Sequence, residues 1–144
     1  MIDNNQKYNT YKQLKVNLKK AISAKFWFEA CMIEYAIIED RVSSILIHTG
    51  VCGDSANKKR MSDKLKKIDK QIEKGNNIIS KKVDKDITER IRIWSKTRND
   101  IVHRACVSVL DENELQDMVL EGNEIVRLIT NNARRVKNYC DKTQ

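Results

Sequence analysis

The sequence predicts an all-α fold, an antiparallel bundle of four to five helices, from three observations. The 144 residues contain no proline and only four glycines, so few positions interrupt a helix. Residues that favour helices, such as lysine, glutamate, isoleucine, leucine and alanine, are abundant. Apolar residues recur every three or four positions, which is the spacing of one helix face. The length suits a single domain, residues 1–144, with a hydrophobic core of its own.

Two helices are expected in the first third of the chain. The first covers about residues 8–22, with apolar residues on one face and lysines near the other. The second covers about residues 25–49 and ends at Gly50, a residue type that often terminates helices. Its apolar residues have heptad-like spacing, which is typical of a helix packed along its length against a neighbour. They are Phe28, Cys31, Tyr35, Ile38, Val42 and Ile45.

Glycines mark positions of interest in two of the remaining helices. The third helix is expected over about residues 57–74, ends at Gly75 and is the most basic segment of the chain. The last helix is expected over about residues 111–139, with Gly122 on its inward face, where a small residue permits close approach or marks a kink. Short connections between long helices predict antiparallel neighbours.

The fourth helix is expected over about residues 86–110, because capping signals mark both of its boundaries. Asp86 is followed three residues later by Glu89, which is the spacing of a capping box at a helix start. Asp111 and Glu114 repeat this pattern, so the fourth helix must end before them.

The net charge of +8 and the pI of about 9.4 favour a polyanionic partner. Nucleic acid, an acidic protein and, less readily, an anionic membrane surface fit this charge. Lys64, Lys67 and Arg104 are the candidate RNA-binding residues. The alternative is a solvated lysine-rich surface that has the same charge but no such partner.

Cysteine spacing and hydropathy exclude several other classes of protein. The four cysteines show no CxxC or CxH spacing, so neither a zinc site nor a cofactor is expected. The N-terminus lacks a signal pattern, and no apolar run approaches the length that spans a bilayer. These features predict a soluble, reduced, cytoplasmic protein without a membrane partner.

The segment Arg98-Asn99-Asp100-Ile101-Val102-His103 is the most informative part of the chain. Arg98 occupies a position in an apolar stripe, where an unpaired guanidinium is costly to bury. Either a carboxylate neutralises it, or this part of the stripe faces a wet cleft or an interface. Asn99 and His103 point only about 40° apart on an ideal helix, with Arg98 to one side. His103 adds a group that titrates near neutral pH.

Two charged residues of the second helix are candidates to support this motif. Glu34 and Arg41 belong to a row that repeats every seven residues beside the apolar seam, together with Trp27 and His48. Glu34 is expected to hold the guanidinium of Arg98, and Arg41 to extend a positive pocket. The alternative is a partly exposed flank with ordinary ion pairs. His48, in the last turn, is expected to be structural.

The helical layout and the motif resemble the HEPN superfamily, whose signature is an arginine, usually a polar residue, and a histidine four to six residues further on. Arg98, Asn99 and His103 match this signature with a gap of four residues. The resemblance implies a metal-independent endoribonuclease, often a toxin or phage-defence effector, that acts as a homodimer. Other members have lost the motif and serve as RNA-binding or interaction modules.

The residues of the motif also suit this chemistry on physical grounds. The 2′-hydroxyl of RNA can attack the adjacent phosphate and leave a 2′,3′-cyclic phosphate without a metal. His103 would act as base or acid, Arg98 would stabilise the phosphorane, and Asn99 would orient the histidine or a phosphate oxygen. A homodimer would supply both an acid and a base, and an acidic antitoxin or inhibitor protein is a possible partner.

The sequence also permits two other functions. The first is a non-catalytic helical module that binds RNA or a protein partner. The second is a structural dimerisation domain in which Arg98 and Glu34 form a buried ion pair.

Overall fold

Helix is the only regular secondary structure in residues 4–143, the part of the chain that the computed structural model describes. The prediction of an all-α bundle is therefore confirmed. In order, the elements are α1 (Asn4–Ser23), α2 (Trp27–His48), the short 3-10 helix η1 (Asp54–Lys58), α3 (Met61–Lys74), α4 (Ile78–Lys82), α5 (Ile87–Arg104) and α6 (Glu112–Lys142).

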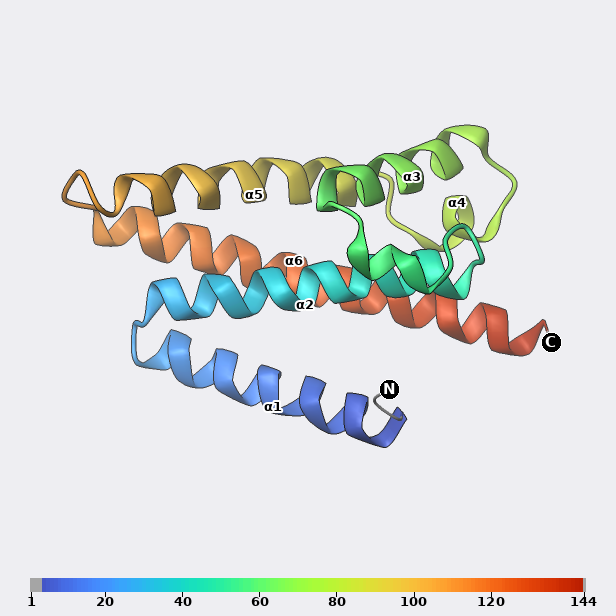
Figure 1. Cartoon of the computed structure of the whole chain (residues 1–144), viewed down its shortest axis with the longest axis horizontal. Helices are drawn as coiled ribbons and strands as arrows, with labels where there is room; N and C mark the ends of the chain where they lie inside the picture. The colour runs from blue at the N-terminus through green and yellow to red at the C-terminus, as the bar shows by residue number, and fades with distance from the viewer. Residues whose placement is uncertain (1–3, 144) are drawn as a thin grey trace.

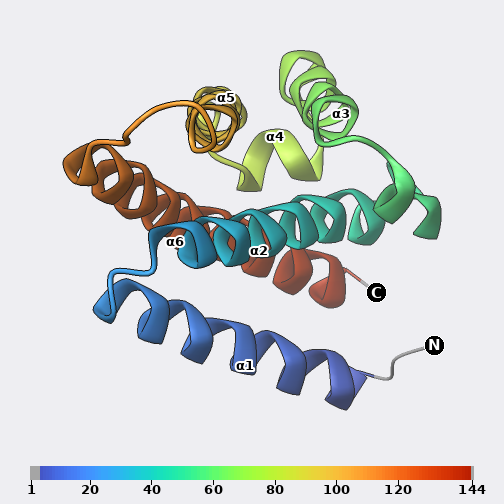
Figure 2. The same ribbon diagram turned by 60° about the vertical axis from the view of Figure 1, so that its left-hand side comes forward.

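The helices α2 and α6 form the centre of the molecule. They run in the same direction and cross along much of their length, with α1 packed on one side and α3, α4 and α5 on the other (Figures 1 and 2). Consecutive long helices are antiparallel, as α1 is to α2 and α5 is to α6. The core lies mainly between α2 and α6. Both helices contribute fully buried isoleucines: Ile37, Ile38 and Ile45 from α2, and Ile125 and Ile129 from α6.

The third helix begins later than expected. We expected it to begin near residue 57, but residues 54–58 form η1, and α3 begins at Met61. Ala56 of η1 is fully buried, so this short turn is packed against the core rather than exposed as a loop. Arg60 therefore becomes the residue that precedes the first turn of α3.

The segment between α3 and α5, where no helix was predicted, contains one more short helix, α4. Its capping box is built by Asn77 and Ser80: the Ser80 backbone N–H donates to Asn77 Oδ1 (2.8 Å), and the Asn77 N–H donates to Ser80 Oγ (3.0 Å). The pattern was missed because Ser80 occupies the position where glutamate or glutamine is usual.

The boundaries of α5 and α6 show which capping signals operate. Asp111 caps α6, and its side chain accepts a hydrogen bond from the Asn113 N–H (2.8 Å). The expected box at Asp86 does not form, since no side-chain cap is present there. The helix α5 ends at Arg104, several residues before the expected boundary, and a turn leads from it to α6 (Figure 1).

Candidate functional site: the cleft between α5 and α3

The helix α5 is fixed in rotation by its apolar stripe. Ile91 and Ile101 are fully buried, and Trp94 donates a hydrogen bond from Nε1 to the backbone carbonyl of Met118 in α6 (2.8 Å). A buried indole with its N–H satisfied is a strong anchor. The helical period then determines where the three residues of the motif lie.

Arg98 lies at the edge of the core, half-buried, and its guanidinium packs on an aromatic ring. Its Cζ is 4.1 Å from the centroid of the Tyr35 ring of α2, which is a cation–π distance. Its Nη2 donates to Asn99 Oδ1 (2.8 Å), whereas its Nε is buried without a hydrogen-bond partner. The ring of Tyr35 also stacks on Trp94, with centroids 6.4 Å apart. The guanidinium is therefore directed towards Asn99 and the protein surface.

Asn99 and His103 are both exposed and line the same open cleft, of about 530 Å³, between α5 and the first turn of α3. The prediction that these two side chains share a face is confirmed. The other wall of the cleft includes Arg60, Met61 and Ser62, and Tyr35 also lines it. An exposed imidazole in an open cleft is accessible to a phosphodiester.

The cleft is basic at its rim. Arg60, Arg92 and Lys96 line it, against one carboxylate, Asp100. Arg92 is partly neutralised, because its Nη2 lies 2.5 Å from Asp69 Oδ2. The sequence did not single out Arg60 or Lys96. Lys96 stands seven residues before His103 and so shares its helix face, a signal that was available, whereas the place of Arg60 depends on tertiary packing.

The expected pair of Glu34 and Arg98 does not form. Glu34 is fully buried and neither of its carboxylate oxygens has a hydrogen-bond partner among the described residues. It points to Gly122 of α6, where an added Cβ would lie 2.3 Å from Glu34 Oε1. The missing side chain of Gly122 makes room for the carboxyl, while Arg98 turns away to Tyr35. The structural interpretation that needed a buried Arg98–Glu34 ion pair loses its basis.

Burial is the main influence on the protonation of two groups in this interior, Glu34 and Cys31. It raises the pKa of Glu34 to about 9, so the carboxyl is neutral near pH 7. It also raises the pKa of the neighbouring Cys31 thiol to about 11, an effect that the positive charge of Arg98 partly opposes. Neither group is ionised near neutral pH, so neither is a nucleophile or a general base there.

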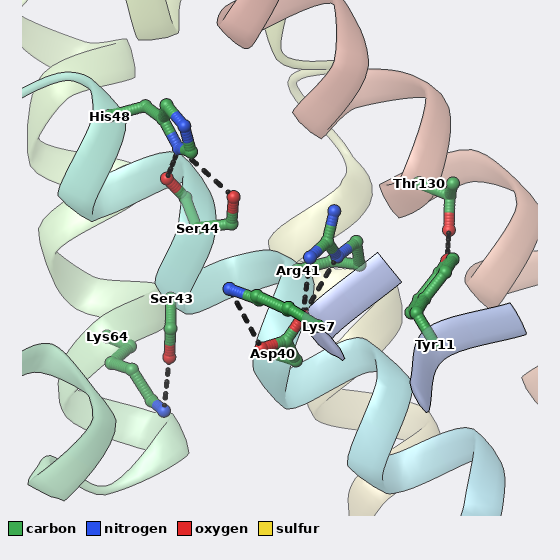
Figure 3. Close-up of polar contacts among 9 residues, drawn as sticks. All are labelled: Lys7, Tyr11, Asp40, Arg41, Ser43, Ser44, His48, Lys64 and Thr130. Carbon is green, nitrogen blue, oxygen red and sulfur yellow. Dashed lines mark hydrogen bonds and ion pairs between the residues drawn. The ribbon is translucent and has the colours of Figure 1, made fainter. Parts of the chain in front are cut away.

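Arg41 lies elsewhere, on the face of α2 that is covered by α1. It pairs with Asp40 and packs on Tyr11, with the guanidinium Cζ 4.9 Å from the ring centroid (Figure 3). The expectation that Arg41 extends a pocket around Arg98 is corrected, because Arg41 packs on Tyr11 of α1, whereas Arg98 of α5 packs on Tyr35.

The three candidate RNA-binding residues have different surroundings. Lys64 is fully buried, and its Nζ donates to Ser43 Oγ (2.9 Å; Figure 3). The same Nζ lies 3.6 Å from Glu39 Oε1, so Lys64 is not available to RNA. Lys67 is half-buried on α3. Arg104 forms an ion pair with Glu114 at the start of α6. The prediction for Lys64 is therefore wrong.

Among residues 4–143, no cluster of three or more histidine, cysteine or acidic side chains is arranged to hold a metal ion. Within the same residues, no helix combines the length and apolar character needed to cross a membrane.

Comparison of the chain with models of protein families, with curated proteins and with solved structures gave no match.

Proposed function

We propose that this chain is a metal-independent endoribonuclease of the HEPN superfamily. The observation that carries the proposal is the placement of the motif: His103 and Asn99 are exposed in one open cleft, and the guanidinium of Arg98 hydrogen-bonds to Asn99 (2.8 Å). The basic rim supports it, because Arg60 and Lys96 would attract the phosphates of RNA.

In the proposed reaction the RNA supplies its own nucleophile. The 2′-hydroxyl attacks the adjacent phosphorus, the bond to the 5′-oxygen breaks, and a 2′,3′-cyclic phosphate remains. His103 takes the proton from the hydroxyl or gives one to the leaving oxygen. Arg98 stabilises the charge of the phosphorane through its guanidinium, and Asn99 positions that guanidinium or a phosphate oxygen.

One histidine cannot be base and acid in the same step, so we propose a homodimer that combines two motifs in one composite cleft.

A toxin or phage-defence effector of the cytoplasm is the role that the resemblance to the superfamily suggests. An acidic antitoxin or inhibitor that covers the basic cleft would then be its protein partner.

The test is cleavage of single-stranded RNA by the variant His103→Ala. Loss of general acid–base catalysis should lower the rate by a factor of about 10²–10⁴. Thr97→Ala is the matched control, because Thr97 lies on the same helix but lines the opposite side, towards α6. Cleavage should persist in EDTA and should spare DNA, which lacks the 2′-hydroxyl. Equal rates for wild type and His103→Ala would refute the proposed mechanism.

A non-catalytic RNA-binding module is the second candidate, and the surface of α3 favours it. The exposed basic residues on or just before α3 are Lys58, Lys59, Arg60, Lys66, Lys70 and Lys74. Such a row binds phosphates without reading sequence, with an affinity that falls steeply as salt rises. Salt-dependent binding of RNA without product at any concentration of the wild-type protein would decide for this candidate.

A further inference from the structure

A second basic cleft lies on the other side of α2, where α1, α2 and α6 meet. It has a volume of about 270 Å³ and is separate from the cleft of His103. Its charged and aromatic residues come from three helices: Lys7, Tyr8 and Tyr11 of α1, Arg41 and His48 of α2, and Lys137 of α6. Residues so far apart in sequence meet here only because the bundle brings these helices together.

Arg41 is held in one orientation in this cleft. Its Nε and Nη2 both donate to Asp40 Oδ2 (3.1 and 2.5 Å), and the Tyr11 ring supports its flat face (Figure 3). The Tyr11 hydroxyl is itself hydrogen-bonded to Thr130 Oγ1 of α6 (2.8 Å), which fixes the ring. A guanidinium held in this way loses little entropy when its remaining N–H donors bind a ligand.

His48 is also oriented by its neighbours. Its Nδ1 lies 2.9 Å from the Ser44 backbone carbonyl and 3.2 Å from Ser44 Oγ (Figure 3). The carbonyl only accepts hydrogen bonds, so Nδ1 carries the proton and Nε2 remains for the cleft. In the imidazolium form of a histidine, Nε2 is a donor that an anion can accept from.

The charges in this cleft are not balanced. Lys7, Arg41 and Lys137 bring three cations, and the neighbouring carboxylate is Asp40, which lies 3.7 Å from Lys7 Nζ. His48 adds a further charge when it is protonated. A phosphate monoester carries a charge of about −1.5 to −2 at neutral pH, which matches this excess better than the single charge of a phosphodiester.

We propose that this cleft binds the terminal phosphate monoester of a ribonucleotide. Arg41, His48 and Lys137 would hold the phosphate. The volume lies below the roughly 300–1,000 Å³ of pockets that enclose drug-sized ligands, so the cleft accepts the phosphate and its sugar rather than a whole dinucleotide. The ring of Tyr8 is 67% exposed at the rim, where a base can stack on it. This site does not depend on cleavage of RNA by the chain.

A free mononucleotide and a phosphorylated end of RNA carry the same group, and calorimetry separates them. The probes are adenosine monophosphate, adenosine, inorganic phosphate, and a short RNA with and without a 5′-phosphate. We expect adenosine monophosphate to bind more tightly than either adenosine or inorganic phosphate. Binding of the phosphorylated RNA, and not of its dephosphorylated form, would assign the site to an RNA end; binding of the mononucleotide alone would assign it to a free nucleotide.

Two substitutions place the binding in this cleft. Arg41→Gln and Lys137→Gln should each weaken binding of adenosine monophosphate about tenfold or more, since each removes a charge-assisted hydrogen bond. Lys137 is exposed, so its variant tests the site even if Arg41→Gln does not fold. Lys19→Gln, an exposed position near the C-terminal end of α1, is the control and should bind as the wild type does. Unchanged binding in Lys137→Gln, or equal affinity for inorganic phosphate and adenosine monophosphate, would overturn the proposal.

Discussion

Glu34 is the most unusual residue of the molecule, because it places a carboxyl in the core without a hydrogen-bond partner. Such a group is tolerated when it keeps its proton, since an isolated charge in a medium of low polarity is far more costly. The raised pKa of Glu34, about 9, expresses this preference for the neutral form. The charge of Arg98 is nearby but is directed to Tyr35 and Asn99, so it does not relieve the cost.

Replacing Glu34 should therefore change how stability depends on pH. The pKa of Glu34 is raised from 4.5 to about 9 on folding, so the folded chain binds more protons than the unfolded chain between these values. The free energy of unfolding of the wild type then falls as pH rises through this window, by up to about 1.4 kcal/mol per pH unit. Glu34→Gln removes the titration and should become more stable than the wild type as the pH rises.

Urea denaturation at several pH values between 5 and 9 measures this difference. Glu29→Gln is the matched control, because Glu29 is exposed on the same helix and its loss should leave the pH dependence unchanged. A constant difference between Glu34→Gln and the wild type across this range would mean that the ionised carboxylate finds a partner in the folded chain.

At the scale of helices, the sequence predicted correctly those features that depend on the helical repeat alone. The apolar spacing predicted the long helices, and the helical angle alone placed Asn99 and His103 on one face. The burial of Lys64 also follows from the helical repeat: Lys64 stands three residues after Met61 and four before Ile68, inside the buried stripe of α3. Its charge made it look like a surface residue, although its position in the stripe indicated burial.

Side-chain partners between helices were beyond the reach of the sequence. Arg98 packs on Tyr35 rather than pairing with Glu34, and this depends on how α2, α5 and α6 cross. The gap left by Gly122 draws Glu34 towards α6, and no pattern within α2 indicates this. Arg41 was likewise assigned to the wrong neighbour, because a seven-residue repeat shows which residues share a face but not which helix covers them.

At the crossing of α2, α5 and α6, any side chain in place of Gly122 should lower stability. An added Cβ would lie 2.3 Å from Glu34 Oε1 and 2.8 Å from Trp94 Cζ2, so both side chains or the helix itself must shift. Gly122→Ala should lower the free energy of unfolding by about 1–3 kcal/mol through overpacking, although alanine favours a helix by about 1 kcal/mol over glycine. Denaturation by urea measures it.

The double variant Glu34→Ala with Gly122→Ala tests the cause. Removing the carboxyl frees the space that the new methyl group needs, so the pair should cost less than the two single changes added together. Strictly additive effects would show that the glycine is needed for another reason, such as its contact with Trp94.

For the whole molecule, the two basic clefts lie on opposite sides of α2 and have different surroundings. The cleft of Arg41 and His48 is closed on one side by α1. The cleft of His103 is open. The first turns of α2 and the last turns of α5 lie at the same end of the bundle (Figure 1). In these turns, Phe28 and Met32 of α2 and Val102 of α5 are large apolar side chains that are exposed. A group of exposed apolar side chains of this kind is typical of a surface that a partner covers.

The proposed homodimer places this apolar end between two copies, which would also bring two His103 side chains towards one cleft. Sedimentation at micromolar concentration should then show a dimer. Met32, 66% exposed, is the most accessible of the three, so Met32→Lys should shift the chain to monomer and lower RNA cleavage together. Val16→Lys, at an exposed apolar position of α1, should leave both unchanged. A wild-type monomer that cleaves RNA at full rate would require the acid and the base to come from one chain, and the composite cleft would have to be abandoned.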